Sequence, residues 1–429
     1  MSELSYLEKL LDGVEVKRLP LGELGELVRG NGLPKSDFTE SGVPAIHYGQ
    51  IYTFYGLSTE TTKSFVSQET AKKLKKVNSG DVVITNTSEN FTDVGKALVY
   101  LGKEQAVTGG HATIFKPNST IIGKYFAYFT QTDSFANEKR KYSKGTKVID
   151  VSASDMAKIT IPIPCPNNPE KSLAIQSEIV RILDKFTALT AELTAELNMR
   201  KKQYNYYRDQ LLSFKEGEVE WKSLGEIATK IYSGGTPDTK RIDYWENGTI
   251  PWMSSGEVNL KNIERTEKYI TEAGLNNSSA KLVPKNSVVI ALAGQGKTRG
   301  KVARIRIALT TNQSLAALTF DEKKFSSDYV FHFLETQYES LRQISSGNSG
   351  RGGLNLQMIS AYKIPIPCPD NPEKSLAIQS EIVRILDKFD TLTNSITEGL
   401  PREIELRQKQ YEYYRDLLFS FPKPETVSN

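Results

Sequence analysis

The sequence has few of the residues on which metal sites, disulfide frameworks and many catalytic centres depend. It contains only two cysteines and three histidines among 429 residues. Cys165 and Cys368 occupy matching points of a duplicated segment, so each belongs to a separate half of the chain, and we expect reduced thiols. His47, His111 and His332 are too scattered along the sequence to predict a metal centre. These shortages disfavour a metalloenzyme and a disulfide-stapled secreted protein.

The sequence also has no long hydrophobic run and no large excess of either charge. No apolar stretch approaches the ~20 residues of a membrane-spanning helix. The N-terminal segment MSELSYLEKLLDGVEVKRL mixes acids and bases among its leucines and lacks the apolar centre of a signal peptide. We therefore expect a soluble, cytoplasmic protein with no membrane association. The net charge of +4 is too small to indicate nucleic-acid binding by itself, so the positions of the basic residues matter more than their number.

What the sequence has in abundance is internal duplication. The segment SLAIQSEIVRILDKF occurs at Ser172 to Phe186 and again at Ser375 to Phe389, each time after an IPIPCP motif. A shorter anchor extends the correspondence, since VPAIHYGQI at Val43 to Ile51 answers IPWMSSGEV at Ile250 to Val258. Between the anchors the halves share little, which is typical of two binding modules that use one scaffold for different targets. A length of 429 residues agrees with about three structural units.

Outside the duplicated segment the apolar runs are short and rich in Val, Ile, Tyr and Thr, with Gly, Pro or Asn between them. Examples are Val82 to Ile84, Val288 to Leu292 and the alternating ARIRI at Ala303 to Ile307. This pattern predicts mixed α/β modules with strand-rich cores.

The duplicated segment is predicted to form a long helix in each half. Its apolar residues recur at alternating steps of four and three, as in the seam of a coiled coil. The predicted seam residues are Ile175, Ile179, Ile182, Phe186, Leu189 and Leu193 in the first copy and Ile378, Ile382, Ile385, Phe389, Leu392 and Ile396 in the second. Each helix is expected to reach roughly 40 residues, and the two helices are predicted to pair antiparallel. Packing of each helix on its own module is the alternative.

The predicted ends of these helices follow from residues with known positional preferences. Pro169 and Pro372 precede the helices, where a missing N–H costs little, and Ser172 and Ser375 are the predicted N-caps.

Inside the first helix, TAELTAEL at Thr190 to Leu197 repeats a four-residue unit. We interpret it as a spacer, because adding or removing one unit changes the helix length by about one turn and keeps the apolar stripe nearly in phase. A neutral low-complexity insertion is the alternative. The second helix has Gly399 and Pro401 in this region, which indicate a kink.

One segment suggests an enzyme. ALAGQGKT at Ala291 to Thr298 fits a relaxed phosphate-binding loop with Ala in place of the first Gly. Such a loop must open a helix, whereas the following RGKVARIRIAL alternates like a strand. The other half has no phosphate motif at the corresponding place, and we find no nucleophile elbow or amino-methyltransferase tetrad. We therefore predict a non-catalytic chain, with a P-loop nucleotide-binding protein as the enzymatic alternative.

Basic residues gather in three clusters within the modules. The clusters are Lys72, Lys73, Lys75 and Lys76; Lys139, Arg140, Lys141, Lys144 and Lys147; and Lys297, Arg299, Lys301, Arg304 and Arg306. Phosphate contact needs such charges near loops, and reading of base edges needs amide or guanidinium forks beside hydroxyls. The third cluster has both kinds, because Gln295 precedes it and TTNQS at Thr310 to Ser314 supplies amides. Ordinary solvated faces remain the alternative for all three.

Two longer segments carry a family resemblance. SGGTPDTKRIDYWENGTIPWMSSGEVN at Ser233 to Asn259 and NGLPKSDFTESGVPAIHYGQIYTFYG at Asn31 to Gly56 each resemble the opening of a target-recognition domain. The paired IPIP motifs, the long helices and the TAEL tandem accompany them. Together these features resemble the specificity subunits of type I restriction-modification enzymes over essentially the whole chain.

The resemblance implies an α+β fold with two mixed α/β target-recognition domains in a pseudo-two-fold arrangement, separated by two long helices packed as an antiparallel coiled coil. The implied boundaries are 1–160 for the first recognition domain, 161–217 for the first helix, 218–363 for the second recognition domain and 364–429 for the second helix.

The resemblance also implies partners. The chain would read a bipartite sequence in double-stranded DNA, one half-site per domain, and would dock two modification subunits, which methylate adenine, as well as restriction subunits. No cofactor is expected in this chain, because S-adenosylmethionine, ATP and Mg²⁺ are expected on the partner subunits. A coiled-coil scaffold without DNA specificity is the non-enzymatic alternative.

Within this framework, the residues expected to contact DNA are polar, basic, aromatic or glycine residues of loops. In the first domain they are Tyr48, Gln50, Asn86, Thr87, His111, Lys139, Arg140 and Lys141. In the second domain they are Gly234, Gly235, Thr236, Trp252, Ser254, Gln295, Lys297, Arg299, Asn312 and Gln313. No catalytic or metal-binding residue is predicted.

Overall fold

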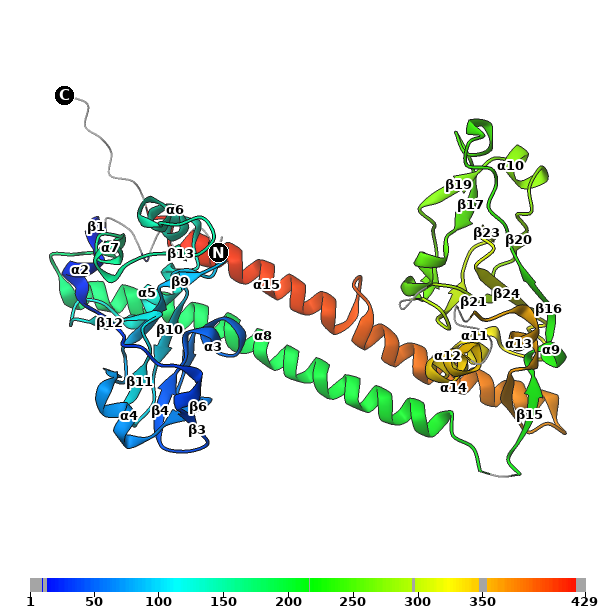
Figure 1. Cartoon of the computed structure of the whole chain (residues 1–429), viewed down its shortest axis with the longest axis horizontal. Helices are drawn as coiled ribbons and strands as arrows, with labels where there is room; N and C mark the ends of the chain where they lie inside the picture. The colour runs from blue at the N-terminus through cyan, green and yellow to red at the C-terminus, as the bar shows by residue number, and fades with distance from the viewer. Residues whose placement is uncertain (1–9, 11–13, 216, 295–297, 347–352, 422–429) are drawn as a thin grey trace. The chain divides into compact units, whose positions relative to one another are not determined.

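The structure is a computed structural model that describes residues 10, 14–215, 217–294, 298–346 and 353–421. Contacts divide the chain into two compact units, of which the first comprises 1–194 with 403–429 and the second comprises 195–402. The dividing points fall inside the long helices α8 (Pro169–Leu211) and α15 (Gly399–Leu418), labelled in Figure 1. Each unit therefore contains one globular domain together with parts of both halves' helices.

The globular domain of the first unit is built on two five-stranded sheets and a two-stranded ribbon. One sheet has the order β2-β12-β8-β10-β5, the other has the order β3-β6-β4-β11-β7, and the ribbon pairs β1 with β14. The strands are β1 (Val16–Pro20), β2 (Gly25–Arg29), β3 (Phe38–Thr39), β4 (Val43–Ile46), β5 (Ser58–Thr59), β6 (Ser64–Val66), β7 (Lys75–Val77), β8 (Val82–Thr85), β10 (Ala97–Tyr100), β11 (Ala106–Thr108), β12 (Ala112–Pro117) and β14 (Thr160–Pro164). A further short pair joins β9 (Thr87–Ser88) to β13 (Ile149–Asp150). All four residues of the central strand β8 are buried, as expected for the run Val, Val, Ile, Thr.

Short helices cover these sheets. They are α2 (Leu21–Leu24), α3 (Tyr48–Thr53), α4 (Gln68–Lys73), α5 (Gly123–Phe129), α6 (Asp133–Tyr142) and α7 (Ala153–Met156). Helix α5 packs on β8 and β10, and six of its seven residues are buried. A helix that is apolar around its circumference has to lie inside the domain, between the sheet and another apolar element.

The second unit repeats this topology. Its sheets have the orders β16-β24-β21-β22-β18 and β19-β17-β23-β20, and its ribbon pairs β15 with β25. The strands are β15 (Val219–Ser223), β16 (Ala228–Ser233), β17 (Ile250–Met253), β18 (Asn262–Ile263), β19 (Lys268–Ile270), β20 (Leu282–Val283), β21 (Ser287–Ala291), β22 (Val302–Ile305), β23 (Leu309–Thr311), β24 (Leu315–Phe320) and β25 (Lys363–Pro367). The helices of this domain include η3 (Ser255–Leu260), α9 (Leu224–Ile227), α11 (Ser327–Thr336) and α13 (Leu356–Ala361). The prediction of two mixed α/β domains on one scaffold is confirmed.

In the first unit, the start of α8 is attached to its own domain by two polar side chains. Gln176 Oε1 accepts a hydrogen bond from the backbone N–H of Ile122 at 2.9 Å. About two turns further along, Asp184 accepts hydrogen bonds from the Tyr128 hydroxyl at 2.7 Å and from Lys124 Nζ at 2.8 Å. These bonds fix the rotation of the helix about its axis relative to α5.

In the second unit, the equivalent residues Gln379 and Asp387 attach the start of α14 (Pro372–Asn394) to its own domain. Gln379 Oε1 accepts from the backbone N–H of Ser326 at 2.9 Å. Asp387 Oδ1 lies 2.7 Å from His332 Nε2 and 2.6 Å from the buried guanidinium of Arg304. The duplicated helix sequence thus serves the same mechanical purpose twice, although its partners in the two domains differ.

The two halves' helices also contact each other within each unit. In the first unit the Phe186 ring of α8 stacks on Tyr414 of α15, and in the second unit Phe389 of α14 stacks on Tyr207 of α8. The beginning of one helix therefore packs with the end of the other, which is an antiparallel pairing. The predicted antiparallel pairing and the alternative, packing of each helix on its own domain, therefore both occur.

The predicted N-caps were wrong by four residues. Asn168 and Asn371 cap the helices, since each side-chain oxygen accepts from a backbone N–H three residues later at 3.0 Å. Ser172 and Ser375 lie one turn inside the helices and are buried. Their hydroxyls accept hydrogen bonds from the side-chain amides of Gln176 and Gln379 instead.

The second long helix is interrupted rather than kinked. Helix α14 ends at Asn394 and α15 begins at Gly399, because the Ser395 hydroxyl captures backbone N–H groups of the intervening turn. Pro401 falls in the first turn of α15, where its missing N–H costs nothing. Ile396 lies in this interruption with 80% of its surface exposed, so its prediction as a seam residue was wrong.

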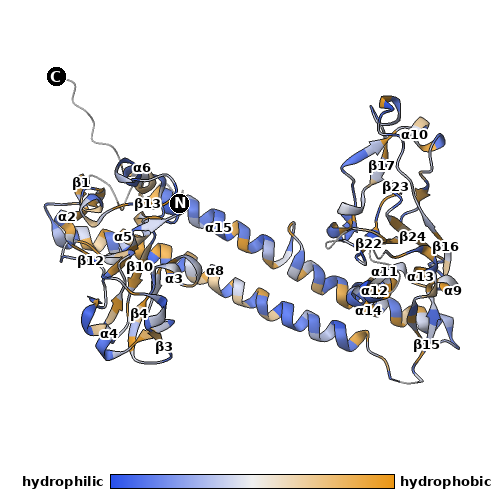
Figure 2. Ribbon diagram, viewed as in Figure 1, coloured by the Kyte–Doolittle hydropathy of each residue, from blue (hydrophilic) through white to orange (hydrophobic). Residues whose placement is uncertain are grey.

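Hydrophobic residues gather in the strands of the domains, whereas α8 and α15 are mainly hydrophilic along their length (Figure 2). Among the helices that the structure describes, none combines the length and the apolar character needed to cross a membrane.

Candidate nucleic-acid interface

Within each domain, loops at corresponding positions come together at one edge of a sheet. In the first domain β4 pairs parallel with β11, and in the second β17 pairs parallel with β23. Because the carboxyl ends of parallel neighbours lie at the same edge, the segments that follow these strands come together. In both domains these segments are rich in polar side chains, and most of the predicted contact residues lie on or beside them.

In the first domain these loops form a cluster of four residues, His47, Tyr48, Thr87 and His111, which we call the first-domain cluster. The Tyr48 ring centroid lies 4.8 Å from that of His111 and 4.6 Å from that of His47. His111 Nδ1 is 2.9 Å from the Thr87 hydroxyl, and both side chains are at the surface. The arrangement offers aromatic edges, ring nitrogens and a hydroxyl, which suit contacts with base edges or sugars.

His47 is the member of this cluster that the sequence did not single out. Burial lowers its pKa, and the nearby positive charge of Lys35 and the ring of His111 act in the same direction. Its Nδ1 accepts from the backbone N–H of Gly49 at 3.2 Å, which caps helix α3. The residue holds the loop that carries Tyr48, and its place directly before Tyr48 in the sequence was the available signal.

Two predicted contact residues of the first domain form hydrogen bonds inside the domain instead of facing solvent. Asn86 is fully buried and its Oδ1 accepts from Thr113 Oγ1 at 2.7 Å, so it is not placed to contact a duplex, and that prediction was wrong. Gln50 is partly buried, donating from Nε2 to Ser64 Oγ at 2.5 Å and accepting from the Tyr55 hydroxyl at 3.3 Å. Both amides support the loops of the cluster from within.

The basic cluster on α6 divides into a buried and an exposed part. Lys139 is 5% exposed, and its Nζ donates to the backbone oxygens of Phe91 at 2.9 Å and of Val94. Burial lowers its pKa to about 8. The prediction that Lys139 contacts phosphate was therefore wrong, because the ammonium holds a loop. Arg140, whose guanidinium lies 4.9 Å from the Phe91 ring centroid, and Lys141, which is paired with Glu138, remain at the surface of α6.

In the second domain the glycines of the SGGTP segment allow close packing rather than contact with a ligand. A Cβ on Gly234 would lie 2.0 Å from the backbone oxygen of Thr311, and a Cβ on Gly235 would lie 1.9 Å from Ser279 Oγ. The indole N–H of Trp252 donates to the Gly235 oxygen at 3.0 Å. Trp252 is only 6% exposed, so its prediction as a DNA contact was wrong and it serves to hold this segment.

The polar residues beyond these glycines form a second group, Thr236, Asn312 and Gln313, which we call the second-domain group. Thr236 Oγ1 donates to Gln313 Oε1 at 2.7 Å, and Gln313 is exposed. Asn312 is partly buried and accepts from the backbone N–H of Ser314 at 3.1 Å, which stiffens the turn between β23 and β24. Ser254 follows β17 and forms a capping box with Glu257, so its hydroxyl is already engaged.

Part of the third basic cluster has a structural role. The Arg304 guanidinium is buried and pairs with Asp387, and Arg306 pairs with Asp328 at 3.0 Å. Alternation along β22 pointed to a strand, but no sequence pattern indicated that these arginines pair with aspartates of the same unit. The interpretation of Arg304 and Arg306 as parts of a DNA-reading cluster was wrong.

The residues of the proposed phosphate loop are only partly described. Gln295 and Lys297 lie outside the described residues. Arg299 is partly buried in the turn at 298–300, which leads directly into strand β22. Since a strand follows the turn, the helix N-terminus that a phosphate-binding loop requires does not occur at this point.

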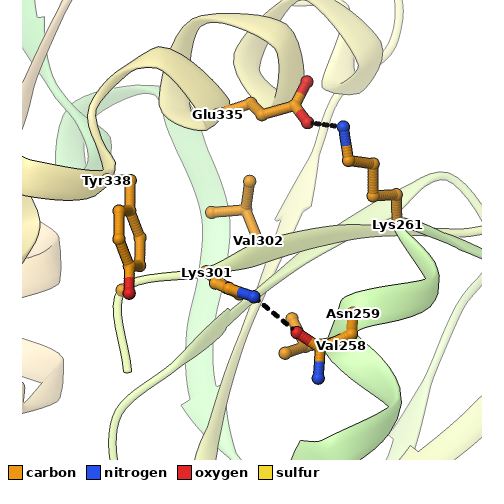
Figure 3. Close-up of a pocket in the computed structure, with 8 residues that line it drawn as sticks. Val258, Asn259, Lys261, Lys301, Val302, Glu335 and Tyr338 are labelled. Carbon is orange, nitrogen blue, oxygen red and sulfur yellow. Dashed lines mark hydrogen bonds and ion pairs between the residues drawn. The ribbon is translucent and has the colours of Figure 1, made fainter. Parts of the chain in front are cut away.

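A further pocket of about 210 Å³ lies in the second domain, and Lys301 of the third basic cluster lines it. Figure 3 shows Lys301 Nζ donating to Asn259 Oδ1 at 2.7 Å and Lys261 paired with Glu335. Tyr338 and Val302 complete its wall. Because its charged side chains pair with one another, the pocket has little capacity to attract an ionic ligand.

The duplicated domains, each with its own loop group and a pair of helix segments, define a two-domain protein that presents two different polar surfaces on one scaffold. The family model described as type I restriction modification DNA specificity domain matches residues 13–200 and again residues 216–406. The chain belongs to this family.

Individual relatives agree with the family match. The chain is 46% identical to the type I restriction enzyme EcoR124I/EcoR124II specificity subunit of Escherichia coli, with all of both chains covered, and 35% identical to the EcoprrI specificity subunit of Escherichia coli, with 93% of each covered. Among solved structures, the S subunit of a type I restriction-modification system from M. genitalium matches with a TM-score of 0.57 at 14% identity, covering 96% of this chain and 98% of that one. At that identity the structural match speaks for the fold alone.

Proposed function

We propose that this chain is the DNA sequence-recognition subunit of a type I restriction-modification complex and reads a bipartite target with one half-site per domain. The observation that carries the proposal is the contrast between the two loop groups. The same sheet edge bears His47, Tyr48, Thr87 and His111 in the first domain. In the second domain it bears the Thr236, Asn312 and Gln313 group. Two readers of unlike half-sites need different hydrogen-bonding groups on a similar frame.

The helices support a second part of the proposal, the docking of two modification subunits. Tyr206 and Tyr413 occupy equivalent positions and are 61% and 57% exposed. Each lies edge-on to the next tyrosine, with centroids 5.4 Å apart in both units. Exposed tyrosines held in place by neighbouring rings are typical anchors of protein interfaces. Because the same surface occurs twice, it suits two copies of one partner.

In this proposal the chain recognises and assembles but does not itself catalyse. The modification subunits, with S-adenosylmethionine, methylate adenine, and restriction subunits, with ATP and Mg²⁺, complete the assembly. The paired helices set the distance between the two half-sites, and the TAEL tandem is the adjustable part of that distance.

The test is DNA binding by the chain co-expressed with its modification subunit, measured over a salt series and against competitor sequences. We expect specific binding that exceeds non-specific binding by at least about 10³-fold and weakens linearly with the logarithm of salt concentration. A scaffold without DNA specificity predicts no preference at any salt. A P-loop nucleotide-binding protein predicts ATP turnover by the chain alone that Lys297→Ala abolishes.

A further inference from the structure

The turn between β23 and β24 holds one exposed amide in a fixed orientation. The backbone N–H of Asn312 donates to the Met253 oxygen at 3.0 Å, and the Asn312 side chain accepts from Ser314 N–H at 3.1 Å. The turn is therefore tied to the neighbouring strand and braced internally. Gln313 stands on this turn, exposed, with its Oε1 accepting from Thr236 Oγ1 at 2.7 Å.

Several buried contacts place Thr236 beside that amide. The Gly235 N–H donates to the Thr311 oxygen at 2.9 Å, and the Gly235 oxygen accepts from the Trp252 indole. Gly234 and Gly235 pack so closely that neither position has room for a Cβ. The segment is thus pressed onto the end of β23, and Thr236, the next residue, is held at the turn. The glycines and Trp252 act on a ligand only through Thr236.

In the structure the Thr236 hydroxyl donates to the oxygen end of the Gln313 amide and holds the side chain at one place on the turn. This hydrogen bond uses one lone pair of Oε1 and leaves the second lone pair and both Nε2 hydrogens to a ligand. In the major groove adenine presents one donor, N6–H, beside one acceptor, N7, and a glutamine amide matches both at once. Guanine presents two acceptors there, thymine an acceptor and a methyl group, and cytosine a donor, so none of them satisfies both ends of the amide.

We infer that Gln313 reads the major-groove edge of an adenine in the half-site of the second domain, and that Thr236 is the positioning residue that places its amide. This inference rests on the proposed function. Without the Thr236 hydroxyl the Gln313 side chain loses the contact that places it on the turn, so its amide no longer meets the base edge in one position and the preference for adenine weakens.

The test uses the full chain in complex with its modification subunit and a DNA library randomised across both half-sites. Gln313→Ala is expected to reduce the preference for adenine at one position of one half-site by roughly 10- to 100-fold, leaving the other half-site unchanged. Gln313→Glu, whose carboxylate only accepts hydrogen bonds, is expected to move the preference at that position toward cytosine.

Thr236 needs its own readout, because a structural role alone would weaken binding without changing base preference. Thr236→Val is expected to relax the same single position, and Thr236→Ser, which retains the hydroxyl, is expected to restore it. Gln357→Ala removes an exposed glutamine of the same domain on α13 and is the matched control, with no expected change.

The outcomes separate the inference from the proposed function. If the wild-type complex selects a bipartite motif but Gln313→Ala and Gln313→Glu keep the wild-type preference at every position, the inference is overturned and the proposed function stands. The same holds if the wild-type motif specifies no adenine in the affected half-site. If the wild-type complex selects no bipartite motif, the proposed function fails, and the inference fails with it.

Discussion

Phe186 of α8 stacks on Tyr414 of α15 with ring centroids 5.1 Å apart and ring planes inclined by 25°. In the other unit, Phe389 stacks on Tyr207 at 5.7 Å and 26°. Each pair joins a residue of the SLAIQSEIVRILDKF segment to a residue of a second repeated motif, YYRD, which occurs at 206–209 and 413–416. The two residues of a pair come from opposite halves of the sequence. The duplication therefore produces the same contact twice, each time between a helix that leaves a domain and a helix that arrives at it.

A double-mutant cycle on Phe186→Leu and Tyr414→Leu tests this contact. We expect a coupling free energy of about 0.5–1.5 kcal/mol, because the two rings stack in addition to burying apolar area. Urea denaturation of the full chain supplies the four free energies of unfolding. The control cycle pairs Phe186→Leu with Phe38→Leu, a residue that packs in a different cluster of the same domain, and should be additive. Additivity of the Phe186 and Tyr414 changes would contradict the stacking.

The contact between Asp387 and the second domain predicts a pH dependence. Burial acts to raise the pKa of Asp387, but the hydrogen bond from His332 and the charge of Arg304 outweigh it and hold the pKa at about 2, against an ordinary 3.8. Because the folded-state pKa is depressed, the stabilisation is complete above about pH 4 and is lost as the pH falls toward 2. We expect a loss of about 1 kcal/mol, reduced for the partial exposure of the carboxylate.

The measurement is the free energy of unfolding of the wild type and of Asp387→Asn between pH 5 and pH 2.5. The two should converge as the pH falls, since the variant has no carboxylate to protonate. Parallel curves over this range would show that the ion pair contributes nothing to the folded state.

The buried ammonium of Lys139 predicts a pH dependence of the same sign, but in alkaline solution. Burial lowers the pKa of its ammonium to about 8 from an ordinary 10.5, so between these values the unfolded chain binds more protons than the folded one. Stability should therefore rise with pH in this window, by about 2 kcal/mol. In Lys139→Met this component should be missing, while the salt dependence of DNA binding should be unchanged. Lys141→Met, an exposed lysine of the same helix, is the control.

The sequence was sufficient to predict the frame of this protein and insufficient to predict which polar groups it exposes. Runs such as Val82 to Ile84 and the repeated helix segment follow from periodicity and composition, because burial of apolar strands and seams is repeated along the chain. The topology of the two domains then follows from the duplication. A strand or helix predicted in one half of the sequence is expected at the matching place in the other half, because the same anchor segments recur in both.

Side-chain burial is not visible in the same way. Lys139 belongs to the run KRK, which is typical of a charged surface. In the structure Lys139 lies on the buried face of its helix, and its ammonium donates to the backbone oxygens of Phe91 and Val94. Trp252 was predicted to contact DNA, but its indole N–H donates to the Gly235 oxygen. Both depend on partners far away in the sequence. The loop residues Thr236 and Gln313 were predicted individually, and only the fold reveals that they form a hydrogen-bonded pair.

The four-residue repeat in α8 leads to a prediction about DNA geometry. Deleting Thr194 to Leu197 shortens the helix by about 6 Å, close to one turn, and keeps the apolar stripe in phase. Because this equals the rise of about one to two base pairs at ~3.4 Å each, we expect the non-specific gap of the target to shorten by about one to two base pairs, with both half-sites retained. Thr190→Ala with Thr194→Ala, which alters composition but not length, should leave the gap unchanged. An unaltered gap in the deletion variant would refute the spacer interpretation.

The central claim, that each domain reads its own half-site, is tested most directly by mapping modified adenines across the genome of cells that co-express the chain and its modification subunit. The account predicts one asymmetric motif of two specified half-sites around an unspecified gap. It further predicts that His111→Ala relaxes only one half-site and Gln313→Ala only the other. A continuous motif, or a single half-site altered by both variants, would contradict it.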